Sequence, residues 1–358
     1  MDTQFWSGRK VFVTGHTGFK GSWLSQWLYQ LGAEVTGYAL TANTEPSLFE
    51  ILNLKNKITS IEGNVCNLAA LKNAVQSSQP EVVFHLAAQP LVRRSYQEPV
   101  ETYETNLMGT VNILESVRVA SNVRAFVNIT TDKCYENKEW LWGYRETEPL
   151  GGYDPYSSSK ACSELITAAY RSSFFNQSNS NVSHVGVATA RAGNVIGGGD
   201  WAADRLIPDI LSSFAKKDPV LIRNPNAVRP WQHVLEPLRG YLQLAELLYK
   251  KEASFSEAWN FGPLDGDSKA VEWIVENMAG LWGPEATWKL VGTPQPHEAN
   301  NLKLDISKAI NRLNWRPYLS LEESLKMIVE WEKARLEGKN MMDITSNQIS
   351  NYQSNFKK

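Results

Sequence analysis

Short apolar runs alternate with longer amphipathic segments along the first half of the chain. Six apolar runs have the length and the β-branched content of buried strands: Arg9–Thr14, Glu34–Leu40, Ile58–Glu62, Glu81–Gln89, Arg124–Thr130 and His184–Ala190. Amphipathic segments between them predict helices, among them Ser22–Leu31, Glu98–Ala120 and Ala161–Phe175. Because strands and helices alternate, we expect an α/β fold with a doubly wound parallel sheet of the Rossmann type.

The alternation ends at Arg191, where a glycine-rich stretch begins. Helices are expected to begin at Arg205 and to cover Val234–Lys250, Lys269–Leu281, Asp305–Leu313 and Leu321–Arg335. We therefore predict a smaller mixed C-terminal lobe that closes over a substrate. The expected division is a Rossmann-type domain over 1–190 with 233–262, a lobe over 191–232 and 263–340, and a loose polar tail over 341–358.

A glycine turn follows the first predicted strand. Its sequence is Gly15-His-Thr-Gly18-Phe-Lys-Gly21. A strand, a glycine turn and a helix N-terminus together present backbone N–H groups to a pyrophosphate, although a tight turn that needs small residues gives the same pattern. After the second strand, Tyr38–Thr41 holds neither an acidic residue for a ribose nor an arginine for a 2′-phosphate. The choice between NAD and NADP therefore stays open.

Tyr156 and Lys160 stand four residues apart at the start of a predicted helix. At that spacing both side chains lie on one helical face. An ammonium beside a phenol favours the phenolate, so we expect Tyr156 to act as a base below its free pKa of about 10. The spacing alone arises by chance in many helices, but here it follows five strand-helix units.

Composition excludes several classes of protein. The 358 residues carry a net charge of -2, which argues against nucleic acid as a partner. No apolar stretch approaches membrane-spanning length, and the N-terminus shows no secretory signal. Cys66, Cys134 and Cys162 lack the spacing of a metal or redox site. We expect a cytoplasmic protein without a metal site or a membrane partner.

Five motifs, placed in this order, resemble those of the extended short-chain dehydrogenase/reductase family. They are Thr14–Trp23, Thr130–Tyr135, Gly152–Ser157, Arg191–Trp201 and Arg229–Val234. The likeness covers Val11 to about Trp331 and is closest to the nucleotide-sugar 4,6-dehydratases. Within that branch, the Gly-Gly-Gly-Asp-Trp and Arg-Pro-Trp-Gln-His stretches resemble the members that act on CDP-glucose.

The resemblance implies a hydro-lyase that carries out a redox-neutral cycle on tightly held NAD. The sugar is oxidised at C4, loses water across C5 and C6, and regains hydride at C6 as a 4-keto-6-deoxy sugar. Tyr156 with Lys160 is the implied base, and Thr131 bonds the same oxygen. Asp132 is the implied general acid, which needs partial burial to raise its pKa.

Lys133 departs from the pattern of most of these dehydratases, which carry glutamate after the aspartate. A lysine removes a proton only when neutral, and burial or a nearby cation would have to depress its pKa. Three roles stay open: the base at C5, the positioning of a water, or stabilisation of the enolate.

The resemblance assigns further residues to the two ligands. For the cofactor they are Gly15, Thr17, Gly18, Phe19, Lys20, Gly21, Asn64, Val65, Leu86, Ala87, Ala88 and Asn106, besides Tyr156 and Lys160. For the substrate they are Gln89, Asn194, Arg205, Leu206, Arg229 and Trp231. The two arginines suit a diphosphate, and Trp201 or Trp231 is expected to stack on the pyrimidine.

The resemblance also implies a homodimer, with a tetramer left open. The dimer would be a four-helix bundle built from Glu98–Ala120 and Ala161–Phe175, and the pathway would be 3,6-dideoxyhexose synthesis for surface polysaccharide such as the O-antigen of lipopolysaccharide. A nucleotide-sugar 4-epimerase or C4 reductase remains an alternative that does not need Asp132. A non-catalytic NAD-binding regulator would not need Thr131, Tyr156 and Lys160 together.

Overall fold

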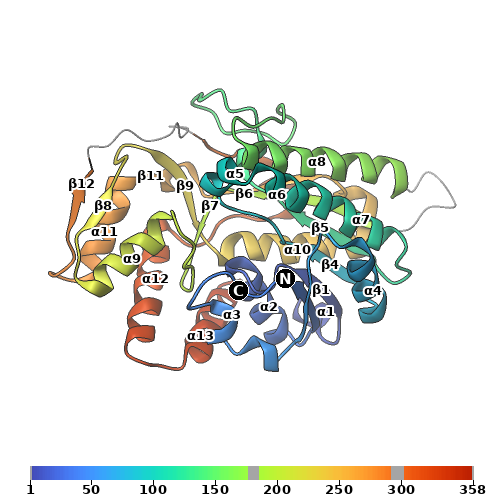
Figure 1. Cartoon of the computed structure of the whole chain (residues 1–358), viewed down its shortest axis with the longest axis horizontal. Helices are drawn as coiled ribbons and strands as arrows, with labels where there is room; N and C mark the ends of the chain where they lie inside the picture. The colour runs from blue at the N-terminus through green and yellow to red at the C-terminus, as the bar shows by residue number, and fades with distance from the viewer. Residues whose placement is uncertain (1, 176–184, 292–301, 357–358) are drawn as a thin grey trace.

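A seven-stranded parallel sheet forms the centre of the computed structural model, which describes residues 2–175, 185–291 and 302–356 (Figure 1). The strand order is β10-β6-β5-β4-β1-β2-β3. Their bounds are β1 (Lys10–Thr14), β2 (Glu34–Ala39), β3 (Thr59–Glu62), β4 (Val82–His85), β5 (Ala125–Ile129), β6 (Gly186–Ala192) and β10 (Ala258–Phe261). The predicted doubly wound parallel sheet is confirmed. The first residue of the predicted sixth strand, His184, lies outside the described residues.

Helices cover both faces of this sheet. On one face lie α4 (Leu68–Ser78), α7 (Gly109–Arg118) and α8 (Pro155–Phe174), and on the other lie α2 (Phe19–Gln30) and α10 (Leu235–Lys251). Strand β1 shows why both faces are apolar: Phe12 packs into the cluster under α4 and α7, while Val11 and Val13 pack into the cluster under α2 and α10. Alternate side chains of a strand point to opposite faces, and here both faces are buried.

A smaller lobe adjoins the sheet, on the left in Figure 1. Its strands are β7 (Asn194–Ile196), β8 (Val220–Ile222), β9 (Val228–His233), β11 (Ser268–Ala270) and β12 (Trp288–Leu290), and its helices are α9 (Leu206–Lys216), α11 (Val271–Trp282) and α12 (Leu321–Leu336). These elements share a separate apolar cluster around Ile210, Phe214 and Leu325. The predicted helices of this half are found within a few residues of their expected bounds, except Asp305–Leu313, which ends in a π-turn at η6 (Ala309–Leu313).

The long helix predicted over Glu98–Ala120 is interrupted. It consists of α6 (Pro99–Tyr103), a π-helical turn η2 (Glu104–Met108) and α7. Single π-turns inside helices often occur at functional sites. Here the wide turn contains Asn106, which is buried against Gln89 and Ser159.

Short elements complete the fold. They are α1 (Thr3–Trp6), α3 (Leu48–Ile51), η1 (Leu54–Asn56), α5 (Val92–Gln97), η3 (Asp132–Cys134), η4 (Glu252–Phe255) and η5 (Asp265–Asp267). Across the described ranges, no helix combines the length and the apolar character needed to cross a bilayer.

The expectation of a loose tail is wrong for most of the C-terminal segment. Residues Met341–Ser354 form helix α13, which packs on α2 and α12. Its few apolar residues fall at helical spacing, so Ile349 and Tyr352 are buried. The Tyr352 hydroxyl donates to Glu236 Oε2 at 2.7 Å and accepts from Arg239 Nε at 3.0 Å. The polar composition of this segment did not indicate a helix, because its contacts with Glu236 and Arg239 of α10 are not visible in the local sequence.

We predict that Tyr352→Phe lowers the free energy of unfolding by about 1–3 kcal/mol, because it leaves buried polar groups without their partner. Urea denaturation measures this. Asn351→Ala, an exposed position on the same helix, is the control and should leave stability unchanged. Equal effects of the two substitutions would contradict the role given to the Tyr352 hydroxyl.

Candidate active site

The glycine turn packs so closely that two of its three glycines have no room for a side chain. A Cβ at Gly15, whose φ is +74°, would lie 2.7 Å from Ala87 N, and one at Gly21 would lie 2.0 Å from Gly15 O. Gly18 is different, because its Cβ would meet only Gly15 O at 3.5 Å. Gly18 is the N-cap of α2 and supplies no side-chain cap. The first N–H groups of α2 are thus left for a ligand, and an anion suits them best.

Thr14 fixes this turn against the end of β4. Its hydroxyl accepts from Leu86 N at 3.1 Å and from Ala87 N at 3.2 Å, and lies 2.7 Å from His85 Nδ1. The carboxyl ends of β1 and β4 therefore stand beside the N-terminus of α2. In parallel sheets this edge holds ligands.

At the neighbouring ends of β2 and β3, neutral side chains fill the space. The ring of Tyr38 lies under Gly63, and its hydroxyl donates to Asn64 O at 3.3 Å. His16 Nε2 lies 2.7 Å from Ser60 Oγ, and burial lowers the pKa of His16 to about 4. Val65, predicted beside Asn64 as a cofactor contact, is buried. His16, which sequence reasoning treated as a turn residue, is neutral and packs against β2.

The predicted catalytic residues come together at the N-terminus of α8 and the end of β5. Asp154 caps α8 by accepting from Ser157 N at 2.9 Å. Lys160 Nζ donates to Ile129 O at 3.3 Å, two residues before Thr131, and the Thr131 side chain hydrogen-bonds Tyr156. Thr131, Tyr156 and Lys160 are all buried. The structure therefore brings the three polar groups of the predicted base into one site.

The surroundings of Tyr156 do not lower its pKa as the sequence predicted. Burial raises the pKa of Tyr156 to about 12, and the hydrogen bond with Thr131 only partly opposes this. Burial also lowers the pKa of Lys160 to about 8. The prediction included the ammonium next to the phenol but not the loss of water around both groups. Burial therefore favours the protonated phenol.

Asp132 lies beside this cluster with one oxygen free. Its side chain is 2% exposed, and its Oδ1 accepts from Thr131 Oγ1 at 3.0 Å. Within the described ranges, its buried Oδ2 has no hydrogen-bond partner. A buried carboxyl oxygen needs a partner, so a ligand group fits there. Lys133 Nζ lies 3.7 Å from Asp132 Oδ1 and is 34% exposed.

Basic groups from α2, α8 and the start of α9 lie close to one another in this site. Lys20, on the first turn of α2, has its pKa lowered to about 7 by burial and by the nearby charges of Arg205 and Lys160, with Asp132 and Asp200 opposing. Arg205 Nη1 donates to Asp200 Oδ2 at 2.8 Å. Three basic groups against two carboxylates leave room for an anionic ligand.

Two predicted ligand residues are engaged with the protein itself. The Gln89 amide donates to Leu91 O at 3.1 Å and to Thr102 Oγ1 at 2.9 Å, and its oxygen accepts from Leu91 N. Asn106 accepts from Gln89 N at 2.8 Å and donates to Gln89 O at 3.1 Å and Ser159 Oγ at 2.9 Å. Gln89 thus ties the loop after β4 to α6, and Asn106 ties the same loop to α8.

The remaining residues predicted to bind the substrate come from the smaller lobe. Asn194 begins β7, Leu206 begins α9, and Arg229 lies in β9 with its Nη1 donating to Val228 O at 3.0 Å. Trp231 is 5% exposed in the core of the lobe, and its Nε1 donates to Lys269 O at 3.1 Å. This burial corrects the expectation that Trp231 stacks on a base. The position of Trp231 in the sequence of β9 did not show which face of the strand is buried.

Sequence reasoning missed three polar residues around the site. Asp200 pairs with Arg205, and Glu164 pairs with Arg191 behind Lys160. Glu164 stands four residues after Lys160 on the same helical face, a spacing that could have drawn attention to it. Arg191 reaches Glu164 through a tertiary contact, whereas Asp200 and Arg205 are only five residues apart.

The glycine turn, the parallel sheet and the Thr131, Tyr156 and Lys160 cluster define a short-chain dehydrogenase/reductase. Residues 12–260 match the family model of GDP-mannose 4,6 dehydratase. The chain is 58% identical over 354 residues to CDP-glucose 4,6-dehydratase of Salmonella typhimurium, covering 99% of both chains. It is 24% identical to UDP-glucose 4-epimerase of Mycoplasma pneumoniae over 88% of this chain and 94% of the relative. The chain belongs to the GDP-mannose 4,6 dehydratase family of nucleotide-sugar enzymes.

Solved structures share the fold. The dTDP-glucose 4,6-dehydratase of Bacillus anthracis in complex with NAD superposes with a TM-score of 0.74 at 21% identity, covering 94% of this chain and all of that one. UDP-glucuronic acid 4-epimerase of Bacillus cereus superposes with a TM-score of 0.77 at 24% identity, covering 91% and 99% of the two chains. The fold is therefore common to dehydratases and epimerases.

Proposed function

We propose that this protein is an NAD-dependent hydro-lyase that converts CDP-glucose to CDP-4-keto-6-deoxy-glucose without net oxidation. Buried Asp132, with Oδ2 free beside Thr131, is the observation that carries dehydration, because elimination needs a proton donor for the leaving hydroxyl. The choice of CDP-glucose rests on the 58% identity to CDP-glucose 4,6-dehydratase over essentially both whole chains.

The residues at the glycine turn fit a dinucleotide. The open side of Gly18 and the N–H groups of α2 suit a pyrophosphate. Asn64, Val65 and the Leu86–Ala88 segment line the sheet edge on either side of it, and Thr17 Oγ1 donates to Leu40 O at 2.9 Å near the end of β2. NAD, when bound, takes hydride from the sugar and returns it, and its positive nicotinamide favours the Tyr156 phenolate.

The proton chemistry follows from the cluster at α8. Tyr156 removes the proton of the C4 hydroxyl, and Thr131 hydrogen-bonds that oxygen. Lys160 offsets the negative charge that remains on Tyr156. The C4 ketone makes the C5 hydrogen acidic, so a water held beside the partly exposed Lys133 takes the C5 proton. Asp132 gives its own proton to the C6 hydroxyl, which leaves as water. Burial of Asp132 keeps bulk water from competing at this step.

For Lys133 we propose the stabilisation of the enolate by charge, and not the removal of the C5 proton. A lysine that removes a proton must be a neutral amine, which needs burial or a neighbouring cation. Lys133 is instead 34% exposed, and its Nζ lies 3.7 Å from Asp132 Oδ1. An ammonium next to C5 would stabilise the negative oxygen formed at C4.

The diphosphate is proposed to lie between the lobes. Arg205 and Lys20 face the site from α9 and α2, and Asn194 and Arg229 come from β7 and β9. A guanidinium can bind a phosphate through two nitrogens. Helix α9 thus links the substrate to closure of the smaller lobe.

The 4-epimerase alternative shares the fold and is represented among the similar proteins. An epimerase also needs the base at C4 but eliminates nothing, so it has no use for a free proton donor at C6. The Asp132 geometry favours the dehydratase. A keto product distinguishes the two.

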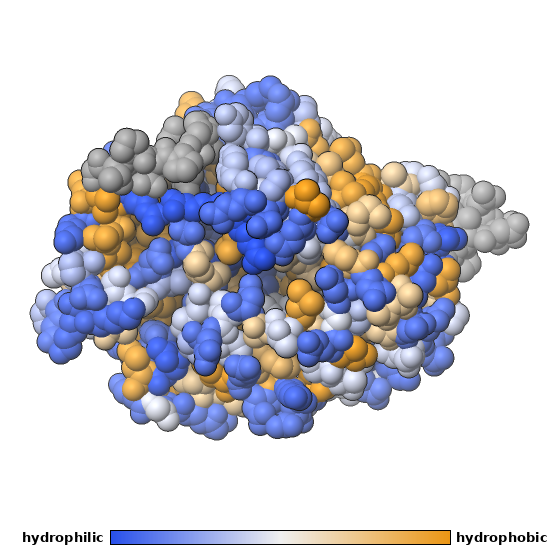
Figure 2. All heavy atoms as spheres, in the orientation of Figure 1, coloured by the Kyte–Doolittle hydropathy of each residue, from blue (hydrophilic) through white to orange (hydrophobic). Residues whose placement is uncertain are grey.

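We further propose a homodimer through α6–α8. These helices expose Val100, Met108 and Leu165 at 68%, 45% and 57%, and Figure 2 shows hydrophobic atoms gathered at the upper right, over these helices. Exposed apolar groups of this size mark an interface when they lie on one face. The α6–η2–α7 and α8 helices pack side by side (Figure 1), as pairing into a four-helix bundle requires.

The product suits 3,6-dideoxyhexose synthesis for surface polysaccharide, including O-antigen of lipopolysaccharide, and we propose that pathway. Cys66, Cys134 and Cys162 are free thiols, which supports a reducing compartment such as the cytoplasm.

The proposed function predicts that protein with NAD and CDP-glucose forms a product with the alkali-induced ultraviolet absorbance of a 4-keto-6-deoxy sugar, without net NADH. UDP-, dTDP- and GDP-glucose are the controls. A keto product from another nucleotide sugar would contradict CDP-glucose as the substrate but would support the same mechanism. Interconverted sugars without a keto product would support the epimerase.

The role of Lys133 predicts a difference between two substitutions. Lys133→Arg keeps the positive charge but cannot act as a base at neutral pH, so elimination should stay within about tenfold of the wild type. Lys133→Met should lose roughly 100-fold or more in the elimination step, while bound NADH still forms. Rates come from rapid-quench analysis of the keto product. Equal loss in both variants would make Lys133 the C5 base, and full activity of Lys133→Met would remove it from the chemistry.

The proposed interface predicts a dimer in sedimentation velocity and a monomer for Leu165→Glu, because a charge would be buried between two copies. Leu221→Glu, at an equally exposed leucine of the smaller lobe (56%), should stay dimeric. A monomeric wild type would contradict the proposal.

A further inference from the structure

A buried ion pair lies behind the catalytic turn of α8. Glu164 stands one turn after Lys160, and its side chain and that of Arg191 on β6 are both 3% exposed. The Glu164 Oε2 accepts from Arg191 Nη2 at 2.8 Å and from Thr189 Oγ1 at 2.7 Å. Its Oε1 accepts from Thr130 Oγ1. One carboxylate therefore ties α8 to β5 and β6.

Thr130 makes this network part of the active site. It directly precedes Thr131, and its backbone N donates to Ala190 O at 2.9 Å. Its hydroxyl meets Glu164 one helical turn from Lys160, whose own ammonium bonds Ile129 O. The strand end that carries Thr131 and Asp132 is thus fixed to the helix that carries Tyr156 and Lys160.

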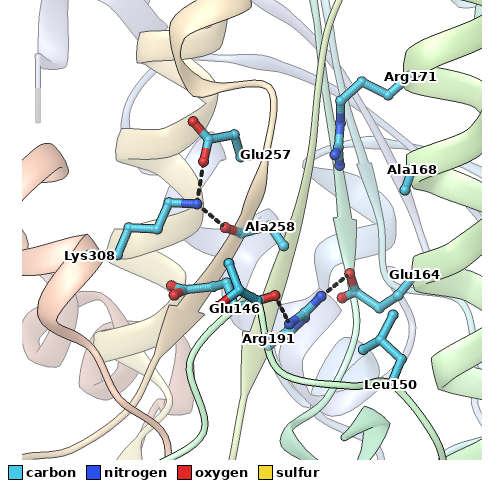
Figure 3. A pocket seen from close by; sticks show the side chains of 10 residues that line it. Glu146, Leu150, Glu164, Ala168, Arg171, Arg191, Glu257, Ala258 and Lys308 are labelled. Atoms are coloured by element: carbon cyan, nitrogen blue, oxygen red, sulfur yellow. Dashed lines mark hydrogen bonds and ion pairs between the residues drawn. The ribbon is translucent and has the colours of Figure 1, made fainter.

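Arg191 holds the carboxylate from the other side. Its Nη1 donates to the Tyr135 hydroxyl at 2.7 Å and to Glu146 O at 3.2 Å, and the Tyr135 hydroxyl donates to Asn260 Oδ1 at 2.7 Å. Figure 3 shows Arg191 between Glu164 and Glu146, at the edge of a cavity of about 300 Å³. Across that cavity, Glu257 forms an ion pair with Lys308.

We propose that Glu164 is a positioning residue for the acid–base chemistry at Tyr156, which holds the end of β5 against α8 and supplies a buried negative charge next to Lys160. This inference rests on the proposed function. The sign follows from the neighbours: burial lowers the pKa of Lys160 to about 8, and the charge of Glu164 opposes that fall. Without it, Lys160 would lose its proton at a lower pH and would no longer offset the charge on Tyr156.

Other titratable and charged groups surround the pair. The groups that interact electrostatically with Lys160 or Glu164 lie on five elements. They are Lys20 on α2, His85 on β4, Cys134 on η3, Arg191 on β6 and Arg171 on α8. Glu164 is the carboxylate that acts on Lys160, so its removal makes the surroundings of Lys160 more positive.

The test compares Glu164→Gln with Glu257→Gln, a matched change at the ion pair across the cavity. Competitive labelling with trace acetic anhydride, read by mass spectrometry across a pH series, gives the pH at which the Lys160 amine becomes neutral. We expect that midpoint to fall by about one pH unit in Glu164→Gln and to stay in place in Glu257→Gln. We also expect kcat to fall roughly tenfold or more with little change in KM, and the alkaline limb of the rate profile to move to lower pH.

An unshifted labelling midpoint together with wild-type kcat would overturn the proposal, as would an equal shift in Glu257→Gln. If Glu164→Gln does not fold, Glu164→Asp keeps the charge but shortens the reach to Thr130. It should lower kcat without moving the midpoint, and wild-type kcat in this variant would also overturn the proposal. Because labelling does not depend on turnover, failure to form a keto product would refute the proposed function while the role of Glu164 is still decided.

Discussion

The close packing of the glycine turn against the end of β4 is the constraint on which the site depends. Gly21 has no space for even one carbon beside Gly15 O, and Gly15 has none beside Ala87. This contact sets where α2 begins, and thereby where its free N–H groups and Lys20 point. Thr14 holds the turn and the β4 loop together through one hydroxyl. A ligand site for an anion is thus built from backbone, before any charged side chain contributes.

Burial then decides the protonation of the groups around that site. Water is removed from Tyr156 and from Lys160 alike, so the phenol keeps its proton and the ammonium holds its proton less firmly than in water. A positive charge next to the Tyr156 hydroxyl would favour the phenolate. The buried carboxylate of Glu164 favours the ammonium of Lys160. Proton transfer at Tyr156 therefore depends on charges that surround the phenol and not on the phenol alone.

Local sequence signals predicted most of the fold and the centre of the site. Short apolar runs identified the strands and amphipathic segments identified the main helices. The spacing of Tyr156 and Lys160 identified the face of α8 that carries both side chains. The failures share one physical cause. Helix α13 and the burial of Trp231 depend on contacts with residues far away in the chain, and a polar or aromatic residue carries no local sign of such a partner. The predicted lowering of the Tyr156 pKa failed for the same reason, because the loss of water around a side chain depends on the whole fold.

The π-turn η2 has a consequence for how this helix can change during evolution. Five residues, Glu104–Met108, occupy a place where a regular helix would need one fewer. One residue inserted into a regular helix rotates everything after it by about 100°. The wide turn takes up that additional residue locally, so α7 keeps its apolar side against the sheet while Asn106 reaches the β4 loop. Loss of one residue here would restore a regular helix and leave α7 near its present orientation, but Asn106 would lose its contacts with Gln89.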